Sequence, residues 1–129
     1  MKVAEIENDI LVIKNREDEK LNGRKGALVK VLGCGLCGSD IVKLTQHRAK
    51  QGTVLGHEIV AFITDINSDT NFKVGDTIIT SHHIPCGKCE YCKNGNVSMC
   101  RHFKETNIFP GGFSAVSYTH LTLPTILRV

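Results

Sequence analysis

Apolar residues occur along the chain in short runs separated by glycine, asparagine and aspartate, which is typical of short β-strands joined by turns. Tight turns are expected at Asn22-Gly23 and around Gly75. Many short strands with glycine at the corners predict a mainly β fold, either a small barrel or a sandwich. The expected strands are Ile10–Lys14, Ala27–Leu32, Glu58–Ile66 and Asp76–Thr80.

Two segments depart from this pattern. In Ser39–Gln46 the apolar residues Ile41 and Leu44 share one face of a helix, and Ser39 or Asp40 would cap its first turn. Residues 82–107 contain few apolar side chains and cannot build a core of their own. This second segment is therefore predicted to be a lobe that depends on a bound metal for its shape.

Composition narrows the classes of protein that fit. The chain has 129 residues, 41% hydrophobic and 22% charged, as in one ordinary globular domain. Its net charge of +3 comes from scattered Lys and Arg, which argues against nucleic acid or a membrane as the partner. No apolar run approaches the roughly 18–20 residues that span a bilayer, and the acidic, mixed N-terminus is unlike a secretory signal. A cytoplasmic protein is expected.

Four of the six cysteines follow the spacing C-x2-C-x2-C-x7-C: Cys86, Cys89, Cys92 and Cys100. In a reducing compartment, clustered cysteines are read as metal ligands before disulfides. Four thiolates suit a closed tetrahedral zinc site without an open position for a substrate. An iron–sulfur cluster is the main competitor, although the C-x3-C-P ending of bacterial ferredoxins is missing. The spacing therefore predicts structural zinc.

The string from Gly33 to Gly38 matches G-x-G-x-x-G and follows a predicted strand. No long helix and second strand follow to complete the βαβ unit of a dinucleotide site, so this interpretation is rejected. The same string contains the pair Cys34 and Cys37, for which a thioredoxin-like redox function is a weak alternative. Cys34 is instead expected to be a small buried residue at a strand end.

A second candidate metal site joins residues that are far apart in the sequence. Cys37 lies twenty residues before His57 and Glu58, and a thiolate, an imidazole and a carboxylate are all good zinc ligands. Two or three protein ligands leave a coordination position open for a substrate, which is the catalytic pattern. An HExxH metalloprotease motif is excluded because Ala61 occupies the place of the second histidine.

The motifs GLCGSD, LGHE, VGDTI and CGKCEYC followed by a fourth cysteine occur in this order. Together they resemble the N-terminal catalytic domain of the zinc-dependent medium-chain alcohol and polyol dehydrogenases. The resemblance covers about residues 1–115 and implies a GroES-like barrel with a short helix and a four-cysteine zinc lobe. In that family a Rossmann domain that binds NAD or NADP follows. This chain has no such half, so its 129 residues alone are expected to lack dehydrogenase activity.

The resemblance also implies roles for single residues. Cys37 and His57 correspond to ligands of a catalytic zinc, and Glu58 either ligates that ion or lies close behind it. Asp40 corresponds to the carboxylate that hydrogen-bonds the zinc-binding histidine. Ser39 corresponds to the hydroxyl that receives the proton of the substrate alcohol. The structural zinc ligands are matched in full by Cys86, Cys89, Cys92 and Cys100.

The implied reaction oxidises a small-molecule alcohol, polyol or hydroxy amino acid to a carbonyl, with zinc as Lewis acid and hydride transfer to NAD or NADP. The full-length enzyme is expected to be a homo-oligomer. One departure concerns the proton route, because many relatives carry a histidine where this chain has Val42. The proton would leave through water, the cofactor ribose or His47, although His47 is better explained as an exposed helix-end residue. His82 and His83 are expected to be solvated, with the cleft wall as the alternative.

The last residues do not continue the family pattern. After Ser114, relatives continue with an acidic residue and tyrosine, whereas Val116–Thr125 resembles the translation of a transposon-type sequencing adapter. Residues 116–129 are therefore expected to be an artefactual tail, and the family domain to end at residue 115. A genuine Thr-rich terminal strand is the alternative.

Other functions compete with a catalytic-domain fragment of a zinc-dependent, NAD(P)-linked oxidoreductase. One is a zinc-binding structural or interaction module without catalysis, in which only the four-cysteine lobe carries function. The scattered charge and few aromatic residues argue against the nucleic-acid-binding form of such a module. A non-catalytic GroES-like barrel is weaker, because reductase relatives of that kind usually lack the four-cysteine lobe.

Overall fold

The secondary structure is dominated by short strands. A computed structural model describes residues 1–121 and 127–128. Its strands are β1 (Lys2–Glu7), β2 (Ile10–Asn15), β3 (Gly26–Gly35), β4 (Glu58–Asn67), β5 (Thr77–Ile79), β6 (Val116–Thr119) and β7 (Leu127–Arg128). The helical segments are α1 (Gly38–Thr45), α2 (Glu90–Lys93) and two 3-10 turns, η1 (Val97–Met99) and η2 (Phe103–Glu105). The predicted mainly β fold is confirmed.

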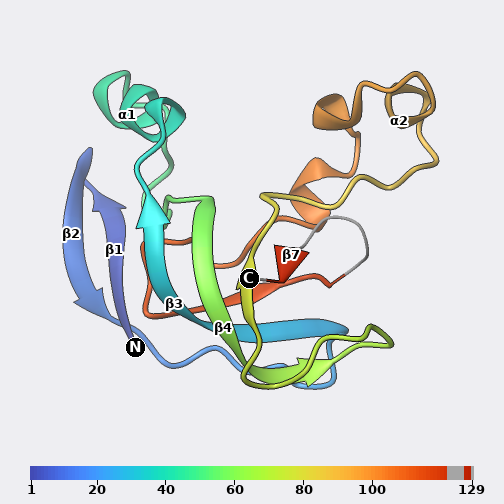
Figure 1. Cartoon of the computed structure of the whole chain (residues 1–129). Coiled ribbons are helices and arrows are strands. Elements are labelled where there is room, and N and C mark those ends of the chain that lie inside the picture. Colours follow the sequence, from blue (N-terminus) through green and yellow to red (C-terminus); the bar gives the residue numbers. More distant parts are fainter. Residues whose placement is uncertain (122–126, 129) are drawn as a thin grey trace.

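The strands form two antiparallel sheets. Five of them lie in the order β6-β3-β4-β5-β7, and β1 pairs with β2 in a separate hairpin. Figure 1 shows the hairpin at one side of the larger sheet, with α1 above it and the lobe containing α2 projecting on the other side. None of the helices in the described ranges has the length and apolar character needed to cross a membrane.

The core lies on one face of the larger sheet. β3 and β4, the longest strands, contribute most of it. β4 alternates buried aliphatic residues with exposed ones, whereas the first four residues of β3 are all buried. Phe72 and Leu121 close the cluster from neighbouring loops. Its buried members are Ala27, Val29, Ile59, Ala61, Ile63, Phe72, Ile78 and Leu121. The four strands and the helix expected from apolar patterning are all present.

The first strand was not expected, because a charged residue interrupts its apolar pattern. Val3 and Ile6 are buried, but so is Glu5, which is only 7% exposed. Lys14 lies on the neighbouring strand β2, and Arg16 follows directly after that strand. Both side chains form ion pairs with the Glu5 carboxylate. Arg16 also donates a hydrogen bond to the carbonyl of Gly52. The buried carboxylate is thus satisfied by two cations, as burial of a charge requires.

The start of α1 differs from the expectation. Neither Ser39 nor Asp40 caps this helix, because the N-cap residue is Cys37. Asp40 occupies the third helical position, and its Oδ2 accepts a hydrogen bond from the backbone N–H of Cys37 at 3.3 Å. This geometry matches half of a capping box, in which a third-position carboxylate reaches back to the cap residue.

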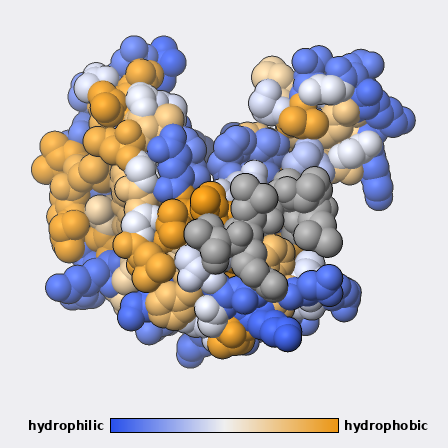
Figure 2. All heavy atoms as spheres, viewed as in Figure 1, coloured by the Kyte–Doolittle hydropathy of each residue, from blue (hydrophilic) through white to orange (hydrophobic). Residues whose placement is uncertain are grey.

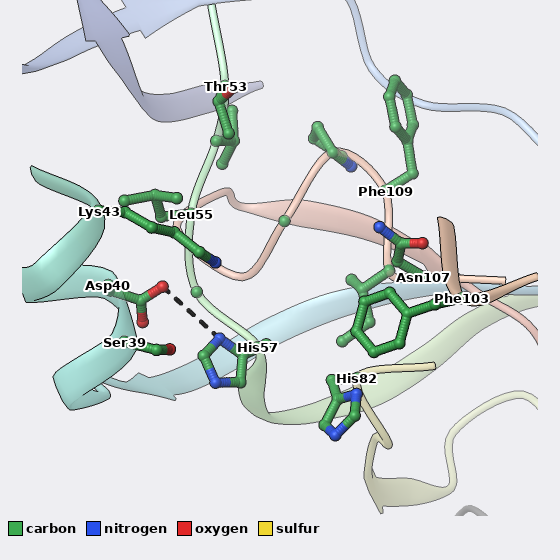
Figure 3. Close-up of a pocket in the computed structure, with 15 residues that line it drawn as sticks. Ser39, Asp40, Lys43, Thr53, Leu55, His57, His82, Phe103, Asn107 and Phe109 are labelled. Carbon is green, nitrogen blue, oxygen red and sulfur yellow. Dashed lines mark ion pairs between the residues drawn. The ribbon is translucent and has the colours of Figure 1, made fainter. Parts of the chain in front are cut away.

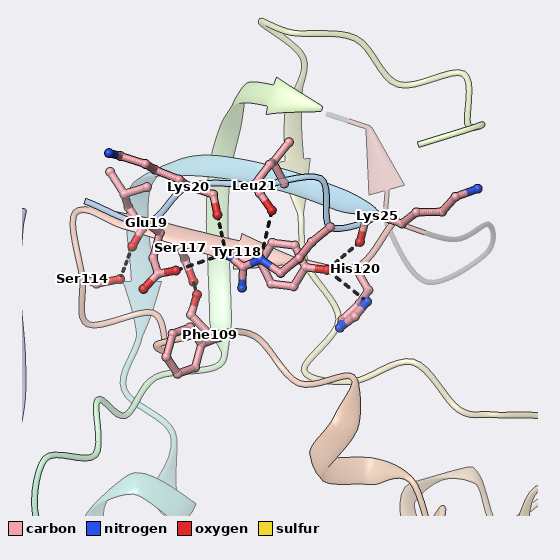
Figure 4. A network of polar contacts seen from close by, with 11 residues as sticks. Glu19, Lys20, Leu21, Lys25, Phe109, Ser114, Ser117, Tyr118 and His120 are labelled. Carbon is pink, nitrogen blue, oxygen red and sulfur yellow. Dashed lines mark hydrogen bonds and ion pairs between the residues drawn. The ribbon is translucent and has the colours of Figure 1, made fainter. Parts of the chain in front are cut away.

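Residues 116–119 have a place in the sheet. β6 pairs with β3 from Ala27↔Thr119 to Lys30↔Val116, and Ser117, Tyr118 and Thr119 are buried. Tyr118 donates its hydroxyl hydrogen to the carbonyl of Lys25, and Ser117 donates to the carbonyl of Phe109 (Figure 4). The interpretation of residues 116–129 as an artefactual tail stays a prediction. Residues 122–126 and 129 of this segment lie outside the described residues.

The ion-pair cluster around Glu5 gives a test of what holds the hairpin. Hydrogen bonds and charge from Lys14 and Arg16 lower the pKa of the Glu5 carboxyl below its ordinary value of 4.5. Folding therefore favours the ionised form, so this contribution is present above about pH 4.5 and is lost as the pH falls through the lowered pKa. We expect Glu5→Gln to lower the free energy of unfolding at pH 7, with a difference from wild type that shrinks towards pH 3.

Chemical denaturation of both proteins between pH 7 and pH 3 measures this difference. Asp69→Asn is the matched control, because Asp69 also pairs with one lysine, Lys25, but is 92% exposed. An exposed pair of this kind contributes little to stability. A stability difference for Glu5→Gln that does not change with pH would contradict the assignment.

Candidate metal centres

The pairing of β3 with β4 brings the first candidate site together. The pairing register of the two strands shifts between Val31 and Gly33. After this shift, Cys34 pairs with Ile59 and Gly35 pairs with Glu58. Gly35 is the last residue of β3 and Glu58 the first of β4. Because the strands are antiparallel, the residues just beyond these ends, Cys37 and His57, become neighbours although they lie twenty positions apart in the sequence.

The three side chains suggested by the sequence converge at this sheet edge. Cys37, His57 and Glu58 each offer one potential ligand atom, and these three atoms all lie within 4.8 Å of one another. A Cβ on Gly35 would lie 2.3 Å from Oε2 of Glu58, so the absence of a side chain there makes room for the carboxylate. Sulfur, imidazole nitrogen and carboxylate oxygen form a donor set that fits zinc with an open position.

Asp40 lies behind the histidine of this cluster. It is fully buried, and its Oδ1 faces Nδ1 of His57 at 3.5 Å. Among the residues that the structure describes, that oxygen has no hydrogen-bond partner, whereas Oδ2 accepts a hydrogen bond from the Cys37 N–H. The arrangement orients Nδ1 of His57 towards the carboxylate and leaves Nε2 for a ligand. A buried carboxylate aimed at an imidazole is the usual support of a metal-binding histidine, so these residues fit a metal.

A cleft of about 390 Å³ opens beside this cluster. Ser39, Asp40 and Lys43 of α1 line one side, and His82 and Phe103 belong to the other (Figure 3). Figure 2 shows the molecule hollowed between the α1 side and the four-cysteine lobe. A second hollow is lined by Glu58 together with His57 and His82, so the two histidines border both spaces. The candidate metal cluster is therefore accessible to a small molecule.

The four remaining cysteines form a second cluster. The Sγ atoms of Cys86, Cys89, Cys92 and Cys100 lie within 4.8 Å of one another. Gly87 and Gly95 adopt positive φ values of 68° and 79°, which lets the backbone turn around the sulfurs. A group of four thiols fits a closed tetrahedral zinc site. Apart from Cys100 and His83, this lobe has little buried surface, as the sequence predicted.

Backbone N–H groups aim at these sulfurs. The N–H groups of Cys89 and Lys88 both lie 3.4 Å from Sγ of Cys86 and lower the pKa of that thiol. The N–H groups of Arg101 and Cys92 lower the pKa of Cys89 to about 6. Burial raises the pKa of Cys92. The lobe thus favours thiolate at some ligands, and a dication would offset the cost of ionising the rest.

The two histidines at the start of this lobe, His82 and His83, differ from the expectation that both are solvated. His83 is buried, only 4% exposed, and His82 lines the cleft. Burial, His83 and His57 lower the pKa of His82. The solvated interpretation is therefore wrong for His83, because Phe103 packs on its ring with centroids 4.3 Å apart. The sequence offered no signal for this, since Phe103 is twenty residues away.

Other sequence expectations are met or corrected by neighbouring geometry. The G-x-G-x-x-G string runs from β3 into the eight-residue α1, and the next strand, β4, is antiparallel to β3. A dinucleotide site needs a parallel βαβ unit, so its rejection is confirmed. Cys34 is partly buried and packs against the core. His47 is exposed at the helix end and pairs with Asp9 at 3.0 Å.

Sequence reasoning missed several residues of the cleft. Lys43, Asn107 and Phe109 line it, although no motif includes them. Lys43 follows the cleft-lining Asp40 by three positions, so helical spacing alone would have placed both on one face. Asn107 and Phe109 reach the cleft from a loop after η2, and only the three-dimensional fold places them there.

Comparison with known proteins identifies the class. The alcohol dehydrogenase GroES-like domain matches residues 23–123, and the chain belongs to this family. The alcohol dehydrogenase TADH from Thermus sp. ATN1 superposes with a TM-score of 0.80 at 23% identity, covering 100% of this chain and 40% of that one. At this identity the superposition supports the fold alone. The predicted GroES-like fold is confirmed.

Curated relatives agree with this assignment. Sorbitol dehydrogenase of Bacillus subtilis is 37% identical over 79 residues, which are 57% of this chain and 22% of that protein. Probable D-xylulose reductase A of Emericella nidulans is 37% identical over 93 residues, 67% of this chain and 26% of that protein. The chain thus spans about a quarter of the length of these relatives.

The contact between Asp40 and His57 gives a test of metal binding. Asp40→Asn keeps the size of the side chain but removes the negative charge that faces the imidazole. We expect it to weaken zinc binding at the Cys37, His57 and Glu58 cluster by roughly 10–100-fold. Competition with a zinc chelator measures this affinity. Ser39→Ala is the control, since Ser39 is exposed and outside the ligand cluster. Equal zinc affinities for wild type and Asp40→Asn would remove Asp40 from the site.

Proposed function

We propose that this chain is the catalytic domain of a zinc-dependent, NAD(P)-linked oxidoreductase that interconverts a small-molecule alcohol or polyol and its carbonyl. The observation that carries the proposal is the convergence of Cys37, His57 and Glu58 beside an open cleft. Four thiols in a closed cluster alone would indicate a structural site, whereas three mixed ligands next to a cavity suit substrate chemistry. Relatives named for sorbitol and D-xylulose support this substrate class.

Each residue of the proposed site has a separate role. Zinc held by Cys37, His57 and Glu58 would act as a Lewis acid on the oxygen of the substrate. Asp40 orients the His57 ring through Nδ1 and stabilises the positive charge that the imidazole shares with a bound cation. Ser39 lies in the first turn of α1 and lines the cleft, where its hydroxyl can accept a proton from the substrate alcohol and pass it on.

The proton route beyond Ser39 differs from that of many relatives. Val42 provides no proton acceptor, and His47 pairs with Asp9 at the exposed end of α1. His47 does not line the cleft. Water and the cofactor ribose therefore remain as the proposed acceptors, rather than His47.

The four-cysteine lobe is proposed to hold a second, structural zinc. Its ligands are Cys86, Cys89, Cys92 and Cys100. The lobe supplies Phe103 to the cleft and packs it on His83, so an ordered lobe also shapes the cleft wall. A zinc-binding module without catalysis is the second candidate function. The closed four-thiol cluster alone would favour this non-catalytic module. In such a module, however, the cluster of Cys37, His57 and Glu58 would have no function.

Metal stoichiometry distinguishes the two functions. We expect the purified chain to bind two zinc ions, and Cys37→Ser and Cys89→Ser each to bind one, because each substitution removes a ligand from one cluster. Elemental analysis after dialysis measures the ratio. Cys34→Ser is the matched control, since Cys34 packs against the core and belongs to neither cluster, and it should keep two ions.

Cobalt substitution then tests the open position. With cobalt(II) in place of zinc, adding an alcohol should change the visible absorption of wild type and Cys89→Ser but not of Cys37→Ser. One metal per wild-type chain, insensitive to Cys37→Ser and to added alcohol, would support the module without catalysis and contradict the proposed enzyme.

A further inference from the structure

Strand β2 is the outer strand of the hairpin, at the side of the molecule in Figure 1. The far side of β1 is occupied, because Ala4 donates its backbone N–H to the carbonyl of Phe113 at 2.7 Å. Ile6 likewise donates to the carbonyl of Thr53 at 2.9 Å. In the part of the chain that the structure describes, β2 pairs with β1 alone. The other edge of β2 is therefore free for a further strand.

The alternation of the antiparallel ladder identifies the backbone groups on this edge. Met1 and Arg16 exchange both of their backbone hydrogen bonds, at 2.6 and 2.9 Å. Hydrogen-bonded and non-hydrogen-bonded pairs alternate along such a ladder, so the even-numbered residues of β2 bond to β1. The N–H and C=O groups of Leu11, Ile13 and Asn15 therefore point away from β1.

The side chains of this edge are apolar and exposed. Ile10 and Ile13 are 61% and 69% exposed, and Figure 2 shows apolar residues gathered on the hairpin side of the molecule. Soluble proteins usually protect an edge strand with a free lysine, a proline or a bulge. Here Lys14 is held by two glutamates of β1, at 3.1 and 3.0 Å, and the register with β1 is regular. An edge of this kind is suited to pairing with another strand.

The sequence of β2 is complementary to itself in the antiparallel direction. Asp9 and Lys14, at opposite ends of the edge, have side chains that are 50% and 39% exposed. Antiparallel pairing places the acidic end of one copy beside the basic end of the other, whereas parallel pairing in register would oppose lysine to lysine. With Val12 of both copies on a two-fold axis, Leu11 of each copy faces Ile13 of the other. Both of these residues carry outward backbone groups, so their hydrogen bonds can form.

We propose that the outer edge of β2 pairs with the same edge of a second copy of this chain, antiparallel about a two-fold axis. The two hairpins then form one continuous sheet, and each copy contributes the same patch. A six-residue edge is small beside the roughly 1,200–2,000 Å² that stable interfaces bury, so the dimer dissociates on dilution. The inference is independent of the proposed function, because the described residues of both metal clusters and of the cleft lie outside β2.

Self-association is measured by analytical ultracentrifugation of the zinc-loaded chain from about micromolar to about millimolar concentration. We expect a monomer that becomes a dimer as the concentration rises. Ile13→Lys should weaken this association about tenfold, because it places a charge among the opposed aliphatic side chains of both copies. Val74→Lys is the matched control, since Val74 is 60% exposed and lies between β4 and β5, outside the hairpin. It should keep the wild-type association.

A chain that stays monomeric over the whole range would overturn the proposal. So would a dimer that Ile13→Lys leaves intact, or one that Ile13→Lys and Val74→Lys weaken equally, because the interface would then lie elsewhere.

A cysteine on the proposed axis tests the register by gain of a covalent link, which a misfolded variant would not give. Val12 of the two copies would form a non-hydrogen-bonded pair, in which opposed Cα atoms are about 4.5 Å apart, within the range of a disulfide. We expect zinc-loaded Val12→Cys, treated with oxidised glutathione, to form a dimer linked through residue 12, as identified by peptide mass mapping. Ile10→Cys is the control, because Ile10 is well exposed but would face Lys14 of the other copy. Equal linkage in both variants, or none in Val12→Cys, would contradict the proposed pairing.

Discussion

The candidate catalytic site depends on one backbone pairing, Gly35 against Glu58 at the shared end of β3 and β4. All three candidate ligands are fixed by it, because Cys37 follows one strand and His57 precedes the other. Shifting the register by one residue would turn Glu58 to the opposite face of the sheet. The glycine at position 35 belongs to the same constraint, since a Cβ there would occupy the space of the Glu58 carboxylate.

The same pairing also explains the cleft. The cysteine that follows β3 begins α1, and this helix carries Ser39, Asp40 and Lys43 to the cavity. Asp40 links the two ends of the pairing, because one oxygen holds the Cys37 N–H and the other faces His57. The first turn of α1 therefore supports the helix start and the candidate metal ligand at once.

Much of this could be predicted from the sequence. The strands β2, β3, β4 and β5 and the helix α1 follow from apolar patterning, and the four-cysteine cluster follows from its spacing. The cluster of Cys37, His57 and Glu58 was suggested by the ligand types and by the family resemblance. β1 was missed because Glu5 occupies a buried position that only ion pairs from elsewhere make tolerable. The environment of His83 was missed for a similar reason: Phe103 and Val97 contact it only after the lobe has folded.

The two candidate metal clusters differ in how far apart their ligands lie along the chain. The four thiols fall within residues 86–100, so a short, unfolded segment already holds the complete donor set for one ion. The other set spans residues 37–58 and exists only after β3 and β4 have paired. Closing a short segment around an ion costs less chain entropy than assembling distant ligands. Metal loading during biosynthesis would therefore follow an order, with the lobe filled from the nascent chain and the sheet-edge cluster filled only after folding.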